Sequence, residues 1–182
     1  NLREDDLNRQ ILMSRDHIGQ SRVQCAAQTL KRFNSDIEVV AIDENVNDMN
    51  ITKLAHDADI IFGCAPLFEE RFILNEFAIR DKKKLIDCAM YSMEGQVMPI
   101  LPGITPCLKC IYPEEPLHWK RRFPVLGAVS ALVAQVGVIE GIKLLCDFDN
   151  ASLGKLVIID ASSMDVKKIK LIPKREDCMA CG

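Results

Sequence analysis

Two pairs of cysteines with the same Cys-x-x-Cys spacing constrain this chain more than any other feature. The first pair is Cys107 and Cys110, and the second pair, Cys178 and Cys181, lies at the end of the sequence. Two residues between cysteines let one tight turn present both sulfurs to one ion, and Zn²⁺ takes four thiolates in a tetrahedron. Two disulfides or a redox-active pair are the alternatives, but a disulfide across two residues is strained and a redox motif is expected once. The pattern predicts a structural zinc ion.

The separation of the two pairs predicts what the metal does for the fold. There are 67 residues between Cys110 and Cys178, whereas a four-cysteine finger has about 15 to 20. The metal is therefore expected to tie the C-terminus to the middle of a larger domain, closing a long loop, instead of nucleating a small finger.

Composition excludes several classes of protein. The 182 residues are 48% apolar and 27% charged, which is ordinary for one globular domain. The formal net charge of −3 supplies no basic stripe, so nucleic acid is not expected as the main partner. The other four cysteines have apolar neighbours and are interpreted as core residues of a protein in the reducing cytoplasm. We find no signal peptide and no apolar run of about 18 residues, so no membrane partner is expected.

The first half of the chain alternates between strand and helix patterns. Apolar residues at helical spacing, such as Ile73, Leu74 and Phe77, mark one helix, and short apolar runs mark the strands. We predict helices over Ser21–Phe33, Asn50–His56 and Phe68–Arg80, and strands over Ile37–Ile42, Asp59–Cys64 and Lys84–Ala89. This succession is typical of a parallel sheet with crossover helices.

The second half predicts antiparallel additions to that sheet. We expect strands over Gly95–Pro102, Lys155–Asp160 and Lys167–Ile172, and a long helix over Leu126–Leu145 whose small residues suit packing against helices or a second subunit. The proline-flanked segment Pro113–Pro124 is predicted to be an exposed loop that covers a substrate. The predicted fold is α/β, a Rossmann-like mixed sheet, mostly parallel with antiparallel C-terminal strands and a zinc-tied C-terminus.

The order of several motifs resembles the ThiF/MoeB/HesA family, the relatives of ubiquitin-activating enzymes. The motifs are Leu7–Gln10, Ile18-Gly19 before a helix, Arg71 after a strand, Met93–Gln96, the two cysteine pairs and Gly137–Leu145. The resemblance spans residues 1–182 and implies a single ThiF-type adenylation domain. It further implies a zinc-bearing homodimer that uses ATP and Mg²⁺ to adenylate a carboxylate.

The resemblance also implies which residues hold the nucleotide. Arg9 falls on the family's phosphate-binding arginine, whose planar fork suits phosphate oxygens, and Arg22 falls where the family has a phosphate-binding lysine. Asn8 and Gln10 would line the same pocket. Asp6 replaces a family asparagine, and it or a neighbouring aspartate is a candidate Mg²⁺ ligand. Without the motif, Arg9 and Arg22 would be interpreted as solvated surface cations.

Two departures from the family pattern affect the catalytic prediction. Pro66 stands where the family has its Mg²⁺-binding aspartate, and proline can neither bind metal nor donate a backbone N–H; Pro66 and Leu67 are still expected to line the nucleotide pocket. The family's glycine-rich loop falls before residue 1, so we expect a preceding segment to supply it. No cysteine lies between Ile111 and Leu126, and the predicted chemistry therefore stops at the acyl-adenylate.

These predictions converge on an ATP-dependent adenylyltransferase in which Arg9 and Arg22 hold the phosphates. The expected substrate is either the C-terminal glycine of a ubiquitin-like sulfur carrier or a small precursor, such as the pyridinol carboxylate of iron-hydrogenase cofactor biosynthesis. Pro66 favours an alternative, a catalytically degenerate binding module that keeps the zinc scaffold and the dimer surface.

Overall fold

The computed structural model describes residues 1–117, 123–148 and 150–182, which form two compact units. The first unit, Asn1–Asn45, contains the 3-10 turns η1 (Glu4–Asp6) and η2 (Arg15–His17) and the helix α1 (Arg22–Phe33). Ser21 caps α1 by accepting a hydrogen bond from the backbone N–H of Gln24. The predicted helix over Ser21–Phe33 is confirmed, and its last residue, Phe33, is exposed.

The predicted strand over Ile37–Ile42 is wrong. None of the described strands pairs with this segment, which contains no regular secondary structure. Its apolar residues Ile37, Val40 and Ile42 are exposed. An alternating apolar pattern becomes a strand only where a neighbour accepts its backbone hydrogen bonds, so the pattern alone could not place this segment in a sheet.

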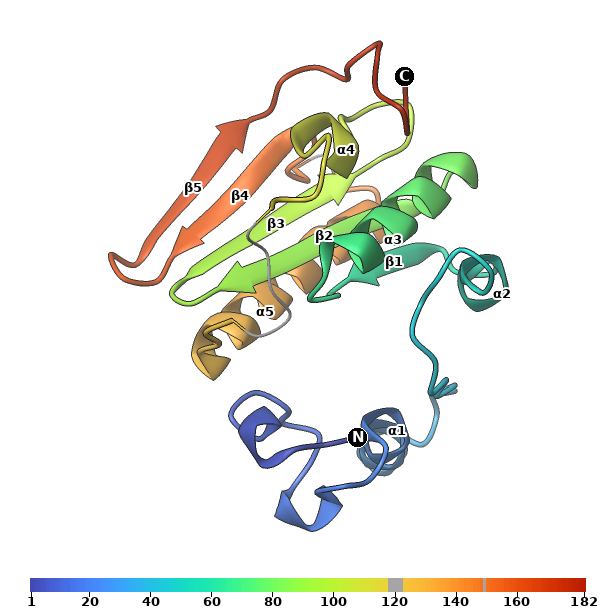
Figure 1. Cartoon of the computed structure of the whole chain (residues 1–182), viewed down its shortest axis with the longest axis vertical. Helices are drawn as coiled ribbons and strands as arrows, with labels where there is room; N and C mark the ends of the chain where they lie inside the picture. Colours follow the sequence, from blue (N-terminus) through green and yellow to red (C-terminus); the bar gives the residue numbers. More distant parts are fainter. Residues whose placement is uncertain (118–122, 149) are drawn as a thin grey trace. The chain divides into compact units, whose positions relative to one another are not determined.

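The second unit, Val46–Gly182, is built on one mixed sheet in the order β1-β2-β3-β4-β5 (Figure 1). Its strands are β1 (Ile60–Gly63), β2 (Lys84–Tyr91), β3 (Glu94–Ile100), β4 (Lys155–Asp160) and β5 (Asp165–Lys170). Strands β1 and β2 pair in parallel, and the later neighbours pair antiparallel. The α/β class and the mixed sheet are confirmed; among the described strands, parallel pairing is confined to β1 and β2.

Helices cover both faces of this sheet. They are α2 (Ile51–Ala55), α3 (Phe68–Arg80), α4 (Leu108–Ile111) and α5 (Gly127–Leu145). The bounds of α2, α3 and α5 agree with the predicted helices to within one residue, and the short α4 was not predicted. Successive residues of β1 face opposite sides of the sheet. The ring of Phe62 lies against Gly141 of α5, whereas a Cβ atom at the next residue, Gly63, would point toward Leu74 of α3. Helices α3 and α5 therefore lie on opposite faces of β1.

Helix α5 approaches the sheet closely because it carries glycines on its inner face. A Cβ atom at Gly137 would lie 2.5 Å from the sulfur of Cys88, and one at Gly141 would lie 2.4 Å from the ring of Phe62. The core on this side contains Ile86, Val97 and Ile159 among its buried residues. The opposite core cluster includes Phe77, Leu85 and the four cysteines of the two Cys-x-x-Cys pairs.

The expectation that no segment is apolar enough to cross a bilayer needs correction at α5. By length and composition alone this helix could do so, with a mean hydropathy of 1.7 over its 18-residue window. A third of that window is buried, and the helix packs on β1, β2 and β3. Core helices of soluble proteins pass the same test, so composition alone does not indicate a membrane span here.

Candidate functional site

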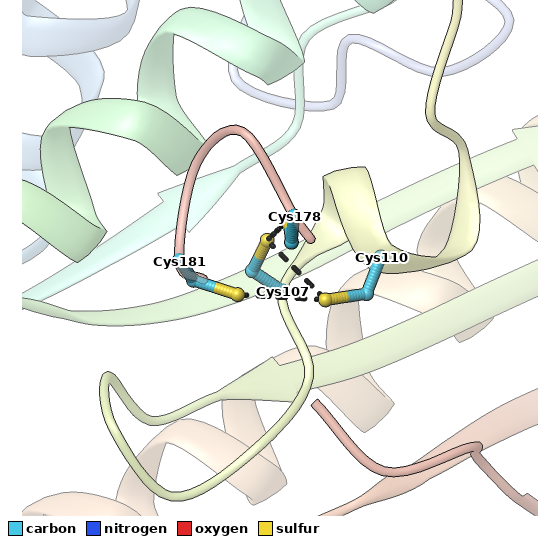
Figure 2. Close-up of side chains that lie close together, drawn as sticks. All are labelled: Cys107, Cys110, Cys178 and Cys181. Carbon is cyan, nitrogen blue, oxygen red and sulfur yellow. Dashed lines mark hydrogen bonds between the residues drawn. The ribbon is translucent and has the colours of Figure 1, made fainter. Parts of the chain in front are cut away.

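The four cysteines of the two pairs meet in one buried cluster (Figure 2). Cys107 precedes the first residue of α4, Cys110 lies within that short helix, and Cys178 and Cys181 come from the C-terminal segment after β5. All four sulfurs lie within 4.8 Å of one another. The predicted convergence of the two pairs, 67 residues apart in sequence, is confirmed.

The spacing of the sulfurs fits a tetrahedral metal ion. Neighbouring sulfurs are 3.9 Å apart for Cys107–Cys110, 3.7 Å for Cys107–Cys178 and 3.4 Å for Cys110–Cys181. A zinc ion with Zn–S bonds of about 2.3 Å would hold its ligands about 3.8 Å apart. All four cysteines are free thiols, which disfavours the alternative of two disulfides. With four protein ligands the coordination would be closed, as in structural metal sites.

The C-terminal turn favours the thiolate form of one ligand. Burial raises the pKa of Cys178, but backbone N–H groups of Ala180 and Cys181 outweigh it and bring this pKa down to about 7. Because metal ligation requires deprotonated sulfur, the turn prepares a ligand near neutral pH. The hydrogen bond from the N–H of Gly182 to the carbonyl of Cys178, 2.8 Å long, closes the same turn.

The first unit gathers several of the residues predicted to hold a nucleotide. The Nη2 atom of Arg9 donates to Asp6 Oδ1 at 2.8 Å, and its Nη1 atom donates to Asn8 Oδ1 at 2.9 Å and to the carbonyl of Asp5 at 3.0 Å. The backbone N–H of Gln10 donates to the carbonyl of Asp6 at 3.0 Å. Asp6, Asn8, Arg9 and Gln10 therefore share one turn.

Asp6 is the buried centre of this turn, with only 1% of its surface exposed. Burial raises its pKa, but the hydrogen bond from the backbone of Arg3 and the charges of Arg9, Arg22 and Arg3 lower it below its usual value. Arg22, the first residue of α1, is therefore close enough to Asp6 for their charges to interact. Both carboxylate oxygens accept hydrogen bonds, from Arg9 and from the backbone N–H of Arg3. This geometry makes Asp6 a partner for arginine, while each of its oxygens keeps a lone pair beyond the hydrogen bond that it accepts.

Pro66 and Leu67 lie in the second unit, between the end of β1 and the start of α3. Leu67 is extended and immediately precedes α3, where Glu69 and Glu70 in the first turn complement the helix dipole. Pro66 offers neither a side-chain oxygen nor an N–H. The segment Pro113–Pro124, predicted to cover the substrate, falls partly outside the described residues, which omit 118–122.

A buried ion pair near this point was missed by the sequence prediction. Arg71 of α3 donates to Asp87 of β2 through two bonds, Nε–Oδ1 at 3.0 Å and Nη2–Oδ2 at 2.6 Å. The guanidinium also lies 4.4 Å from the ring centroid of Phe68. The sequence did offer a sign of this pair, because Asp87 lies inside an otherwise apolar strand and a charged residue is seldom buried there without a partner.

Comparison with known proteins covers the whole chain. Residues 3–180 match the ThiF family. The heterocyst protein HesA of Trichormus variabilis is 42% identical over 182 residues, which are 100% of this chain and 67% of HesA. Adenylyltransferase and sulfurtransferase MOCS3-1 of Drosophila pseudoobscura pseudoobscura is 29% identical over 97% of this chain and 40% of its own length.

Solved structures agree on the fold. MccB of E. coli, solved with ATP, superposes with a TM-score of 0.84 at 22% identity, covering 100% of this chain and 56% of MccB. MccB solved with MccA-N7isoASN gives a TM-score of 0.87, and this chain covers 58% of it. The arrangement of strands and helices is therefore the Rossmann-like fold of these proteins. The match over residues 3–180, together with 42% identity to HesA, shows that this chain belongs to the ThiF family.

Proposed function

We propose that this protein is an ATP-dependent adenylyltransferase that activates a carboxylate as an acyl-adenylate. The observation that carries the proposal is the turn around Asp6, in which a buried carboxylate fixes the guanidinium of Arg9. Membership of a family with relatives named adenylyltransferases, and the likeness of the fold to a protein solved with ATP, support it.

The geometry of Arg9 suits phosphate binding. A guanidinium carries five N–H donors, and three hydrogen bonds hold Arg9 to Asp5, Asp6 and Asn8. Two donors remain for phosphate oxygens, which planar guanidinium groups bind in a bidentate manner. Because Asp6 and Asn8 hold the side chain in place before ATP arrives, little rotamer entropy is lost on binding.

In the proposed reaction the substrate carboxylate attacks the α-phosphorus of ATP and pyrophosphate leaves. Arg9 and Arg22 would neutralise charge on the departing phosphates, and Asn8 and Gln10 would complete the pocket. Pro66 has no atom suited to bind Mg²⁺, so Asp6 or the neighbouring Asp5 would offer a carboxylate oxygen to the ion. Mg²⁺ would enter with the triphosphate, whose oxygens commonly supply part of its coordination.

The four cysteines would hold Zn²⁺ in a structural role. The substrate would be the C-terminal glycine of a ubiquitin-like carrier protein or a small carboxylate precursor, and we propose that the enzyme works as a cytoplasmic homodimer. MccB has been solved with MccA, which supports a peptide or protein terminus as the carboxylate donor.

Pyrophosphate exchange tests the activity directly. Protein, ATP, Mg²⁺ and each candidate carboxylate are mixed with labelled pyrophosphate, and label entering ATP reports the acyl-adenylate. We expect Arg9→Gln to lower exchange about a hundredfold, the scale of losing one donor to developing charge. Arg15→Gln is the matched control, because Arg15 is an exposed arginine of the same unit whose partner is Glu4.

A second candidate function rests on Pro66, which replaces the family's catalytic aspartate. A binding module of this kind would bind a protein tail and have no affinity for nucleotide. Calorimetry with ATP separates the two functions. Tail binding without ATP binding, and no exchange with any carboxylate, would exclude the adenylyltransferase.

A further inference from the structure

Asn75 is a buried polar side chain that the proposed adenylation does not use. It lies in α3 with 0% of its surface exposed. Its Oδ1 atom accepts a hydrogen bond of 2.8 Å from the backbone N–H of Leu108, the first residue of α4. This bond joins α3 to the short helix that carries the first cysteine pair, and it fixes the orientation of the amide plane.

The amino group of Asn75 is left without a standard hydrogen bond. Its Nδ2 atom is buried and unpaired among the described residues. A buried donor that is left unpaired destabilises the fold, so a partner is expected. The candidate is the sulfur of Cys107, the residue that directly precedes Leu108. The Asn75 amide lies close enough to the Cys107 sulfur to interact with it.

We propose that Asn75 donates an N–H···S hydrogen bond to Cys107 when that cysteine is a metal-bound thiolate, and that it positions this ligand in the metal centre. A protonated thiol is a weak acceptor, whereas a thiolate carries the charge that a buried amide proton favours. A hydrogen bond to a metal ligand fixes the orientation of that ligand and slows metal loss. The proposal concerns the metal centre and is independent of the adenylation activity.

This role would connect the metal centre to the rest of the second unit. One amide group would hold both the backbone at the start of α4 and the sulfur of the first ligand, while belonging to α3. The same helix begins at Phe68, directly after Pro66 and Leu67. The C-terminal segment would thus be fixed, through the metal and Asn75, to the helix that follows β1.

Cadmium NMR of the unaltered protein tests the contact itself. The isotope-labelled full chain is loaded with ¹¹³Cd²⁺, a probe that binds four thiolates and couples to protons through N–H···S bonds. We expect a correlation between ¹¹³Cd and a side-chain amide proton that Asn75→Asp removes. Correlations with backbone N–H protons alone, or failure of the four cysteines to bind cadmium, would overturn the proposal.

Metal release from variants tests the consequence. Asn75→Asp keeps an oxygen for the N–H of Leu108 and loses the donor to sulfur, so zinc loss to a chelator should accelerate about tenfold or more. The matched control is Thr105→Val, because buried Thr105 lies in the loop before Cys107 and its Oγ1 atom accepts a hydrogen bond of 2.9 Å from the backbone N–H of Leu101. Equal release rates for the two variants would contradict the proposal. If Asn75→Asp does not fold, the unaltered protein's cadmium correlation, with the amide protons assigned directly, decides.

Discussion

At the scale of single residues, each charged side chain that is buried in the described part of the second unit has a charged partner, as Arg71 has Asp87 and Glu140 has Lys143. The side chains of Arg71 and Asp87 are 1% and 3% exposed and share two hydrogen bonds, and the guanidinium also lies over the Phe68 ring. Transfer of two charges from water is costly, and a bidentate geometry is what recovers that cost. The main effect of the pair is therefore to fix the position of α3 on β2, and its net contribution to the free energy of unfolding is small.

Removing one member of the pair should be far more harmful than replacing both. We expect Asp87→Asn to lower the free energy of unfolding by about 3–5 kcal/mol, because it leaves the Arg71 guanidinium buried without its counter-charge. The double variant Arg71→Met with Asp87→Leu should recover most of that loss. Urea unfolding of the single and double variants measures the difference. A double variant no more stable than Asp87→Asn would show that the pair itself supplies the stability.

The cysteine cluster was predictable at this scale, but the burial of Asn75 beside it was not. Repeated Cys-x-x-Cys spacing is visible in sequence because each turn places two sulfurs together regardless of the surrounding fold. Asn75 has no such signal, since an asparagine in a helix is usually exposed and its burial depends on which segment packs over it. Asp6 was predicted to lie in the same site as Arg9, and the two residues do share one turn. Their hydrogen bond depends on a turn geometry that the motif alone does not specify.

At the scale of secondary-structure elements, periodicity predicted most of the second unit. Helix α3 begins and ends at the predicted residues, because its apolar spacing is helical and its boundaries are marked by Pro66 and by Asp81. Strand β2 extends two residues beyond its prediction to Tyr91, since its pairing with β3 continues to Glu94. Ile37–Ile42 failed because strand formation depends on a partner that lies elsewhere in sequence.

Helix α5 contains a buried carboxylate that makes its packing sensitive to pH. Glu140 is 3% exposed, and its oxygens accept bonds from the backbone N–H of Ser152 at 2.7 Å, from Ser152 Oγ at 2.9 Å and from Lys143 Nζ at 3.0 Å. Burial raises its pKa, but the bonds from Ser152 and Lys143 outweigh burial and lower that pKa below the usual value of 4.5. Its ionised form therefore stabilises the fold.

Glu140→Gln should consequently destabilise the protein in a pH-dependent manner. A carboxylate whose folded pKa is lowered adds stability above its unfolded pKa and loses it as pH falls through the folded pKa. We expect the variant to lose about 1.5–3 kcal/mol of unfolding free energy at pH 7, and the difference to shrink below about pH 4.5. Denaturant unfolding at several pH values measures it. Glu76→Gln, which removes a half-exposed partner of Lys109, is the control and should change little.

At the scale of the whole chain, the cysteine cluster brings together segments that are distant in sequence. Residues 171–182 contain no helix or strand, and Cys178 and Cys181 are buried among residues of α3 and α4. Such a segment has few backbone hydrogen bonds of its own, so its order depends on what its cysteines bind. A metal ion bound to the cluster would close the loop between Cys110 and Cys178.

Removing the metal should therefore release the C-terminal segment before the sheet unfolds. Closing a loop of this length is worth about 4 kcal/mol by the chain-entropy estimate for a cross-link, which corresponds to a fall in Tm of about 10 °C for a unit of this size. We expect a zinc chelator to lower Tm by that amount, and added zinc to restore it.

Trypsin should cleave at Lys174 and Arg175 faster in the chelated protein and in Cys178→Ser. Cys146, like Cys64, was predicted to lie in the core but is exposed, so Cys146→Ser removes a surface thiol outside the cluster and should behave as the unaltered protein does. Cleavage at these two residues that is insensitive to both the chelator and Cys178→Ser would mean that packing, and no metal, holds this segment in place.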